Sequence, residues 1–221
     1  MSFPPPAGPY RQRDDRTGTR RTAVTQESPI VDLGPAARQV TALLSGVSDD
    51  QLTARTPCAE YSVGDLLDHI MGLALAFQNA ARKKAPEDAE RSAPGQGSAA
   101  RLEPGWREEL PRRLDGMAAA WRDPAAWQGS TEAGGVTLPA GVMGLVALDE
   151  LVIHGWDLAR ATGQPFDCDS RSAEAVIGLL SQSALEDRPK ELFGAVVPVP
   201  ESAPALDRAV GLSGRDPAWR A

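Results

Sequence analysis

The chain has 221 residues, of which 42% are hydrophobic and 24% are charged, a composition typical of a globular protein with a core of its own. Its net charge of −7 argues against a nucleic-acid partner, because phosphate binding depends on clustered lysine and arginine. The sequence has neither a run of about 18 apolar residues nor the apolar stretch of a secretory signal. We therefore expect a cytoplasmic protein that does not span a membrane.

Residues 1–28 predict a disordered extension. They are rich in Pro, Gly, Arg and Thr, and their five arginines and three acidic residues leave the segment at +2 and the remainder at −9. A segment with so little to bury cannot offset the entropy that ordering would cost. We assign residues 29–221 to one helical domain.

Apolar residues at helical spacing predict a first helix that starts near Ile30 and ends by Gly46. The second predicted helix has the clearest start signal in the chain. Ser62 is a good N-cap residue, and Asp65 completes a capping-box-like pair with it. The apolar face of this helix continues to about Arg82.

The polar, Pro/Gly-rich stretch over residues 83–105 predicts a long crossover connection. A third helix is predicted from Pro104 or Trp106 to about Trp121, with Pro111 as a point where it can kink. A turn-rich segment with a short strand around Val136 follows.

Pro139 suits the first turn of a fourth helix, which runs to Thr162 before a C-terminal Gly163. Shorter helices are predicted over residues 172–185 and 205–212. Several long helices with one long connection predict an all-α four-helix bundle with short C-terminal helices.

The chain contains two histidines, and both fall within predicted helices. Glu150 and His154 are four residues apart, so on a helix they share one face with Cβ atoms about 6 Å apart. His69 lies at the border of the apolar face of the second helix. If the second and fourth helices are neighbours, two imidazoles and one carboxylate can converge on one divalent metal ion.

Spacing alone leaves other interpretations open. A single histidine beside an apolar face is more often an ordinary core or surface residue than a ligand. A Glu-x-x-x-His pair is also common as a hydrogen bond across one turn of an exposed helix.

Three segments of the sequence resemble those of a known protein family. The segments TPCAEYSVGDLLDHI (residues 56–70) and LDELVIHGWDLARATGQP (148–165) resemble the DinB-like, mycothiol-dependent maleylpyruvate isomerase N-terminal family. The ending PVPESAPALDRAVGLSGRDP (198–217) is similar to the tail of a short, single-domain branch of that family. The resemblance covers about residues 30–217, and Tyr61 stands where the family more usually has tryptophan.

The resemblance implies a DinB-like four-helix bundle in which His69, Glu150 and His154 bind one divalent metal ion. The metal it implies is Zn²⁺, with nickel or iron as alternatives, and the cosubstrate it implies is mycothiol, a low-molecular-weight thiol. The maleylpyruvate isomerase has an additional C-terminal domain that contributes to its active site, whereas only residues 163–221 follow the last ligand helix here. We therefore do not extend the maleylpyruvate reaction itself to this chain.

Three nearby residues are candidates for supporting roles. Asp65 lies one turn before His69, although helix capping is its expected role. Asp157 follows His154 by three residues and suits either a structural hydrogen bond or the orientation of that imidazole. Cys58 is expected to be a small buried residue in a proline-anchored turn rather than a zinc ligand.

The two cysteines are too few and too far apart for a disulfide framework, so we expect reduced thiols. Asp68 and Asp149 each precede a predicted ligand by one position and are expected to be solvated. Trp121 and Trp156 are expected to be core or rim aromatic residues.

Two classes of function fit the sequence. An open metal site with two histidines and one glutamate can bind a thiol, lower its pKa and present it to a small electrophile, which predicts a thiol transferase or isomerase. A site closed by a fourth protein ligand would instead indicate a structural or regulatory metal-binding bundle. The same ligands also suit Fe²⁺ in oxygen chemistry. The sequence identifies no general base, and a homodimer is compatible with it.

Overall fold

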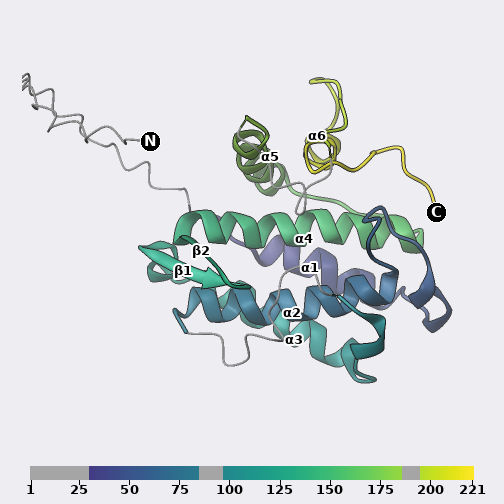
Figure 1. The fold of residues 1–221 in the computed structure, drawn as a ribbon, viewed down its shortest axis with the longest axis horizontal. Coiled ribbons are helices and arrows are strands. Elements are labelled where there is room, and N and C mark those ends of the chain that lie inside the picture. Colours follow the sequence, from purple (N-terminus) through teal and green to yellow (C-terminus); the bar gives the residue numbers. More distant parts are fainter. Residues whose placement is uncertain (1–29, 85–96, 186–194) are drawn as a thin grey trace, which may run out of the picture.

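The structure is a computed structural model that describes residues 30–84, 97–185 and 195–221. Apart from one hairpin, the secondary-structure elements of the described residues are helical (Figure 1). The bundle consists of α1 (Gly34–Leu44), α2 (Val63–Ala81), α3 (Trp106–Ala120) and α4 (Ala140–Thr162). Two shorter helices follow, α5 (Ser170–Leu185) and α6 (Ala205–Leu212). The predicted all-α, DinB-like bundle with short C-terminal helices is confirmed, whereas the predicted extension over residues 1–28 lies outside the described residues.

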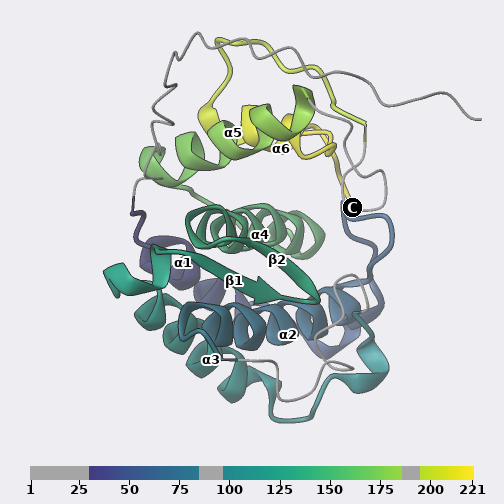
Figure 2. The ribbon, with the colours of Figure 1, turned by 60° about the vertical axis from the view of Figure 1, so that its left-hand side comes forward.

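The four bundle helices enclose one core. α1 and α2 each pack against both α3 and α4. α5 packs against α4, and α6 packs against α5, so these two helices form a further layer over α4 (Figure 2). α4 is therefore covered on two sides, which explains why its residues from Leu151 to Ala159 are all buried.

The long connection between α2 and α3 is only partly described, because residues 85–96 are outside the described residues. Its described end contains a short 3-10 turn, Ala99–Arg101, which packs against α2. A second 3-10 turn, Asp49–Thr53, lies in the predicted loop between α1 and α2 and also contacts α2. Both turns lie beside the helix that carries His69.

A β-hairpin leads into α4. Its strands, β1 (Ser130–Ala133) and β2 (Val136–Pro139), are antiparallel, and Ala133 pairs with Val136. Gly134 and Gly135 have φ angles of 57° and 78°, the left-handed backbone that a two-residue hairpin turn requires. The sequence predicted one short strand around Val136, and the structure adds its partner.

The ends of α2 and α4 follow their capping signals. The Ser62 hydroxyl accepts the Asp65 N–H at 3.2 Å, and the Asp65 carboxylate accepts the Ser62 N–H at 2.9 Å, which confirms the capping box. Gly163 ends α4 in the left-handed region with a φ of 69°. Pro139 is not in the first turn of α4 as predicted, because its backbone is extended and pairs in the hairpin with Ser130.

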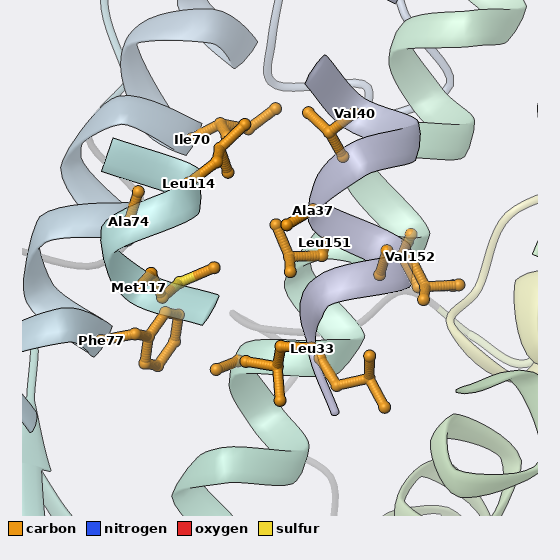
Figure 3. Packing of buried hydrophobic residues seen from close by; sticks show 14 of the residues in the cluster. Leu33, Ala37, Val40, Ile70, Ala74, Phe77, Leu114, Met117, Leu151 and Val152 are labelled. Atoms are coloured by element: carbon orange, nitrogen blue, oxygen red, sulfur yellow. The ribbon is translucent and has the colours of Figure 1, made fainter. Parts of the chain in front are cut away.

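Apolar side chains from all four helices meet in the core (Figure 3). The residues labelled there are Leu33, Ala37, Val40, Ile70, Ala74, Phe77, Leu114, Met117, Leu151 and Val152. Each large apolar side chain buried in this way contributes about 1.5–3 kcal/mol. Because the core is continuous between the helices, we expect the bundle to fold without a bound ion.

Trp121 and Trp156 are 1% and 2% exposed, which confirms them as core aromatic residues. The Trp121 indole donates to the Phe77 carbonyl at 3.1 Å, so the buried N–H has a partner. Among the described helices, none has the length and apolarity needed to cross a bilayer.

Candidate metal centre

α2 and α4 pack against each other and bring the three predicted ligands together. His69 comes from α2, and Glu150 and His154 come from successive turns of α4. One oxygen or nitrogen atom of each side chain lies within 4.8 Å of the corresponding atoms of the other two. The convergence expected from the spacing is therefore present in the structure.

Glu150 lies between the two imidazoles. Its Oε2 atom is 3.0 Å from Nε2 of His154 and 3.7 Å from Nε2 of His69. The two rings are nearly perpendicular, with centroids 5.0 Å apart. The His69 and His154 side chains are 10% and 9% exposed, whereas Glu150 is 28% exposed, so the carboxylate is the part of the site most accessible to solvent.

The negative charge of Glu150 and the positive charge of His154 stabilise each other. Burial disfavours the charge of Glu150, but the neighbouring imidazoles of His154 and His69 outweigh it and hold the pKa of the carboxyl well below its usual range. Burial likewise lowers the pKa of His154, yet hydrogen bonds to Asp157 and Glu150 raise it to about 9. Without an ion, the site is thus an anionic glutamate beside a protonated imidazole, and a metal would take the place of the proton.

Asp157 fixes the orientation of the His154 ring. Its side chain is fully buried, and its Oδ2 atom lies 3.0 Å from Nδ1 of His154. With Nδ1 engaged in this way, Nε2 is the ring nitrogen that faces Glu150. Of the two roles considered for Asp157, the structure shows contact with the imidazole, the usual support of a metal-binding histidine.

Asp65 caps α2 rather than contacting the imidazoles. Besides its bonds to Ser62, its second carboxylate oxygen accepts the Ala99 N–H at 2.7 Å. It therefore joins the start of α2 to the described end of the long connection.

Cys58 lies close to His154 and Asp157. Its Sγ atom groups with His154 and Asp157 within 4.8 Å, but not with the set of His69, Glu150 and His154. It is partly buried, and burial raises the pKa of its thiol. Cys58 is thus less buried than the small buried residue expected at this position.

Two predictions about neighbouring carboxylates are wrong. Asp149 is 6% exposed rather than solvated. Asp68 pairs with Arg101 at 2.9 Å and accepts the Ser98 N–H, so the connection before α3 partly covers it. The outcome for Asp68 depends on a segment distant in the sequence.

Sequence reasoning missed Tyr61 as part of the site. Its ring centroid is 5.0 Å from that of His69 and 6.4 Å from that of His154. Its hydroxyl accepts the Gly97 N–H at 3.4 Å. Tyr61 precedes the N-cap of α2 and so escapes the helical spacing that singled out the ligands.

Gly97 forms part of the wall beside His69. A Cβ atom at this position would lie 2.3 Å from the Asp65 carbonyl oxygen and 3.0 Å from Cβ of His69. Only glycine therefore allows the connection to approach α2 so closely here. The sequence marked this stretch only as a Pro/Gly-rich loop.

Arg215 is a second residue near the site that the helical spacing of the sequence did not predict. It follows α6 in the chain, and its guanidinium lies 3.1 Å from Oδ2 of Asp157. The sequence separation between Arg215 and Asp157 is 58 residues, and no periodic pattern links them.

The family model of the mycothiol maleylpyruvate isomerase N-terminal domain matches residues 33–159, more than half of the chain. The chain belongs to this family. The match includes all three residues of the candidate metal centre and ends before α5.

A relative of this family member is an uncharacterized protein of Mycobacterium tuberculosis, known from the strains CDC 1551 and H37Rv. The two sequences are 31% identical in a 193-residue alignment that covers 79% of this chain and 90% of the relative. The similarity to this relative covers a larger share of the chain than the family match over residues 33–159 does.

Two solved structures share the fold. The crystal structure of the mycothiol-dependent maleylpyruvate isomerase aligns with a TM-score of 0.52 at 17% identity, over 67% of this chain and 66% of that chain. A histidine-to-alanine variant of that isomerase aligns with a TM-score of 0.54 at 16% identity, over 75% of this chain and 71% of that chain. This family member therefore spans about two thirds of the isomerase, and at these identities the likeness shows the fold alone.

Proposed function

We propose that this protein binds one divalent metal ion through His69, Glu150 and His154 and uses it to activate a low-molecular-weight thiol of the mycothiol type. The reaction class is thiol transfer to a small electrophile or thiol-assisted isomerisation. The observation that carries the proposal is the convergence of one ring nitrogen from each imidazole and one carboxylate oxygen within 4.8 Å of one another. The choice of a mycothiol-type thiol is supported by membership of the mycothiol maleylpyruvate isomerase N-terminal domain family.

The donor set fits the proposed ion. Two imidazoles with one carboxylate suit Zn²⁺, and Ni²⁺ and Fe²⁺ also accept these donors. Glu150 supplies a negative charge that its neighbours stabilise, and Asp157 supports the ring of His154 from the opposite nitrogen. These are the features expected of residues that hold a cation.

Three protein ligands leave a coordination position for a further ligand. Among the described residues, the group that includes His69 and Glu150 contains three ligand side chains and not a fourth. A bound ion would supply Lewis acidity, which lowers the pKa of a coordinated thiol. The chain's own contribution is to orient the His154 imidazole through Asp157, to keep Glu150 anionic, and to place the Tyr61 ring beside both histidines.

The test combines metal analysis with thiol chemistry. Purified protein should contain about one equivalent of Zn²⁺, Ni²⁺ or Fe²⁺, and it should consume mycothiol or a simpler thiol in the presence of small electrophiles. Substituting Co²⁺ should give a spectrum that changes when the thiol is added, because the site keeps an exchangeable position.

The matched variants are Glu150→Gln and Glu174→Gln. Both remove one carboxylate charge, but Glu174 lies on α5 and pairs with Arg208 at 3.5 Å. Only Glu150→Gln should lose the metal and the thiol reaction. A protein that binds its ion tightly but shows a thiol-insensitive cobalt spectrum and no thiol consumption would instead be a structural or regulatory metal-binding bundle.

A further inference from the structure

The C-terminal segment reaches the candidate metal centre through Arg215. A guanidinium nitrogen, Nη2, donates to Oδ2 of Asp157 at 3.1 Å. The same oxygen lies 3.0 Å from Nδ1 of His154. One carboxylate oxygen is thus shared between an arginine from the end of the chain and a predicted metal ligand on α4.

The contact is buried. The Asp157 side chain is 0% exposed and the Arg215 side chain is 13% exposed. A buried carboxylate without a cation is costly, and an arginine can both neutralise it and fix its position. Burial lowers the pKa of Arg215, but the charge of Asp157 outweighs this and raises it, so the arginine stays protonated.

The backbone around Arg215 is fixed by the end of α6. Gly214 adopts the left-handed conformation with a φ of 88°, and the Arg215 N–H donates to the Val210 carbonyl at 3.1 Å. The guanidinium also donates to the Ser213 carbonyl at 3.2 Å. Two residues further on, the Pro217 carbonyl accepts a hydrogen bond from Arg160 of α4 at 3.1 Å.

We propose that Arg215 is a positioning residue for the metal centre: by holding Oδ2 of Asp157 against Nδ1 of His154, it keeps Nε2 of that ring directed at the ion site. This rests on the proposed function for the metal itself. It extends the functional unit beyond the family domain, which ends at residue 159. The C-terminal helices then contribute to the site and are more than a cover for α4.

The first experiment uses the metal-free protein and histidine NMR. The chain has two histidines, so ¹⁵N-histidine labelling gives two ring systems, and His69 is an internal control. In the wild type, the Nδ1 proton of His154 should be shifted downfield and exchange slowly with water. In Arg215→Met it should move upfield and exchange faster, while the His69 signals keep their positions.

The second experiment measures Zn²⁺ affinity by competition with a chelator. Loss of a residue that supports a ligand costs about 10- to 100-fold in metal affinity, and we expect Arg215→Met to weaken binding by about tenfold. In an Asp157→Asn background, the same substitution should have no further effect, because Arg215 acts through Asp157. Arg215→Lys should restore part of the affinity, since it keeps the charge but loses the planar fork.

Arg160→Gln is the matched control. It removes the hydrogen bond to Pro217 but leaves the Arg215–Asp157 pair, so it should change neither the His154 signal nor the Zn²⁺ affinity. If Arg215→Met misfolds because Asp157 is left uncompensated, Arg215→Lys and the double variant with Asp157→Asn still provide the test.

An unchanged His154 proton in Arg215→Met and Arg215→Lys would overturn the proposal. So would an equal loss of Zn²⁺ affinity with and without Asp157, or an equal effect of Arg160→Gln. A wild-type protein that binds no divalent metal would refute the proposed function instead, and the NMR of the metal-free protein would still decide the role of Arg215.

Discussion

The Nε2 atom of His154 lies 3.0 Å from Oε2 of Glu150, one turn earlier on α4. In the absence of an ion this contact is an ion pair within the site, and it uses the same atoms that a metal would bind. Proton and metal therefore compete for His154.

Replacing His154 with alanine should abolish tight metal binding and leave the helical fold. The loss of affinity should exceed about 100-fold, because a lost ligand costs more than the 10- to 100-fold typical of a lost supporting residue. The bundle should persist because its apolar core is continuous and Asp157 keeps its pairing with Arg215. Circular dichroism with and without Zn²⁺, together with chelator competition, measures both effects. Unfolding of the metal-free variant would show that the residue is needed for the fold.

The metal-free protein should lose stability as the pH rises through about 9. The folded-state pKa of His154 is raised to about 9 from an ordinary value of 6.5. Its stabilising contribution is therefore complete below pH 6.5 and is lost as the folded protein gives up its proton. Thermal unfolding between pH 6 and 10 should show this decline in the wild type and a flatter profile in His154→Ala. Over the same range Zn²⁺ affinity should increase with pH, because binding releases the proton.

Removal of the capping hydroxyl in Ser62→Ala should lower the free energy of unfolding by about 1 kcal/mol. The Ser62 hydroxyl accepts the Asp65 N–H at 3.2 Å, and neither residue belongs to the three-residue ligand group. Zn²⁺ affinity should consequently change little. Urea unfolding and chelator competition on the same sample separate the two effects. A large loss of affinity without a loss of stability would give this turn a direct role in metal binding.

Tyr61→Ala should destabilise the protein strongly and Tyr61→Phe only slightly. The ring is 9% exposed and packs beside His69, so truncation leaves a cavity that costs about 3–5 kcal/mol. The hydroxyl makes one long hydrogen bond, 3.4 Å from the Gly97 nitrogen, so its removal should cost less than about 1 kcal/mol. Urea unfolding of both variants measures the difference. A Tyr61→Phe protein that keeps its stability but loses thiol turnover would show a chemical role for the hydroxyl.

Deletion of residues 1–28 should leave folding and metal binding unchanged. The segment carries a net charge of +2 and has few apolar residues to bury. The shortened chain should match the full one in helical content, melting temperature and Zn²⁺ affinity. A shortened protein that loses its metal would place part of the site in this segment.

Much of the fold was predictable because its signals are local. The capping box of Ser62 and Asp65 and the left-handed Gly163 mark helix ends through contacts within a few residues. The pair of Glu150 and His154 was recognisable for the same reason, since one helical turn fixes their relative position. Predictions that depended on distant segments were less successful. Asp68 and Asp149 were expected to be solvated, but the connection before α3 partly covers Asp68, and Asp149 is buried.

The sequence by itself determined the helices, the face on which Glu150 and His154 lie, and the family to which the motifs belong, because periodicity and capping act over a few residues. Only the tertiary structure decided that α2 lies against α4, which brings His69 to Glu150. It also decided that Tyr61 adjoins both imidazoles and that Arg215 pairs with Asp157 from 58 residues away. These contacts arise from burial of apolar helix faces, which is non-directional, so spacing along the chain cannot specify which distant polar residues it brings together.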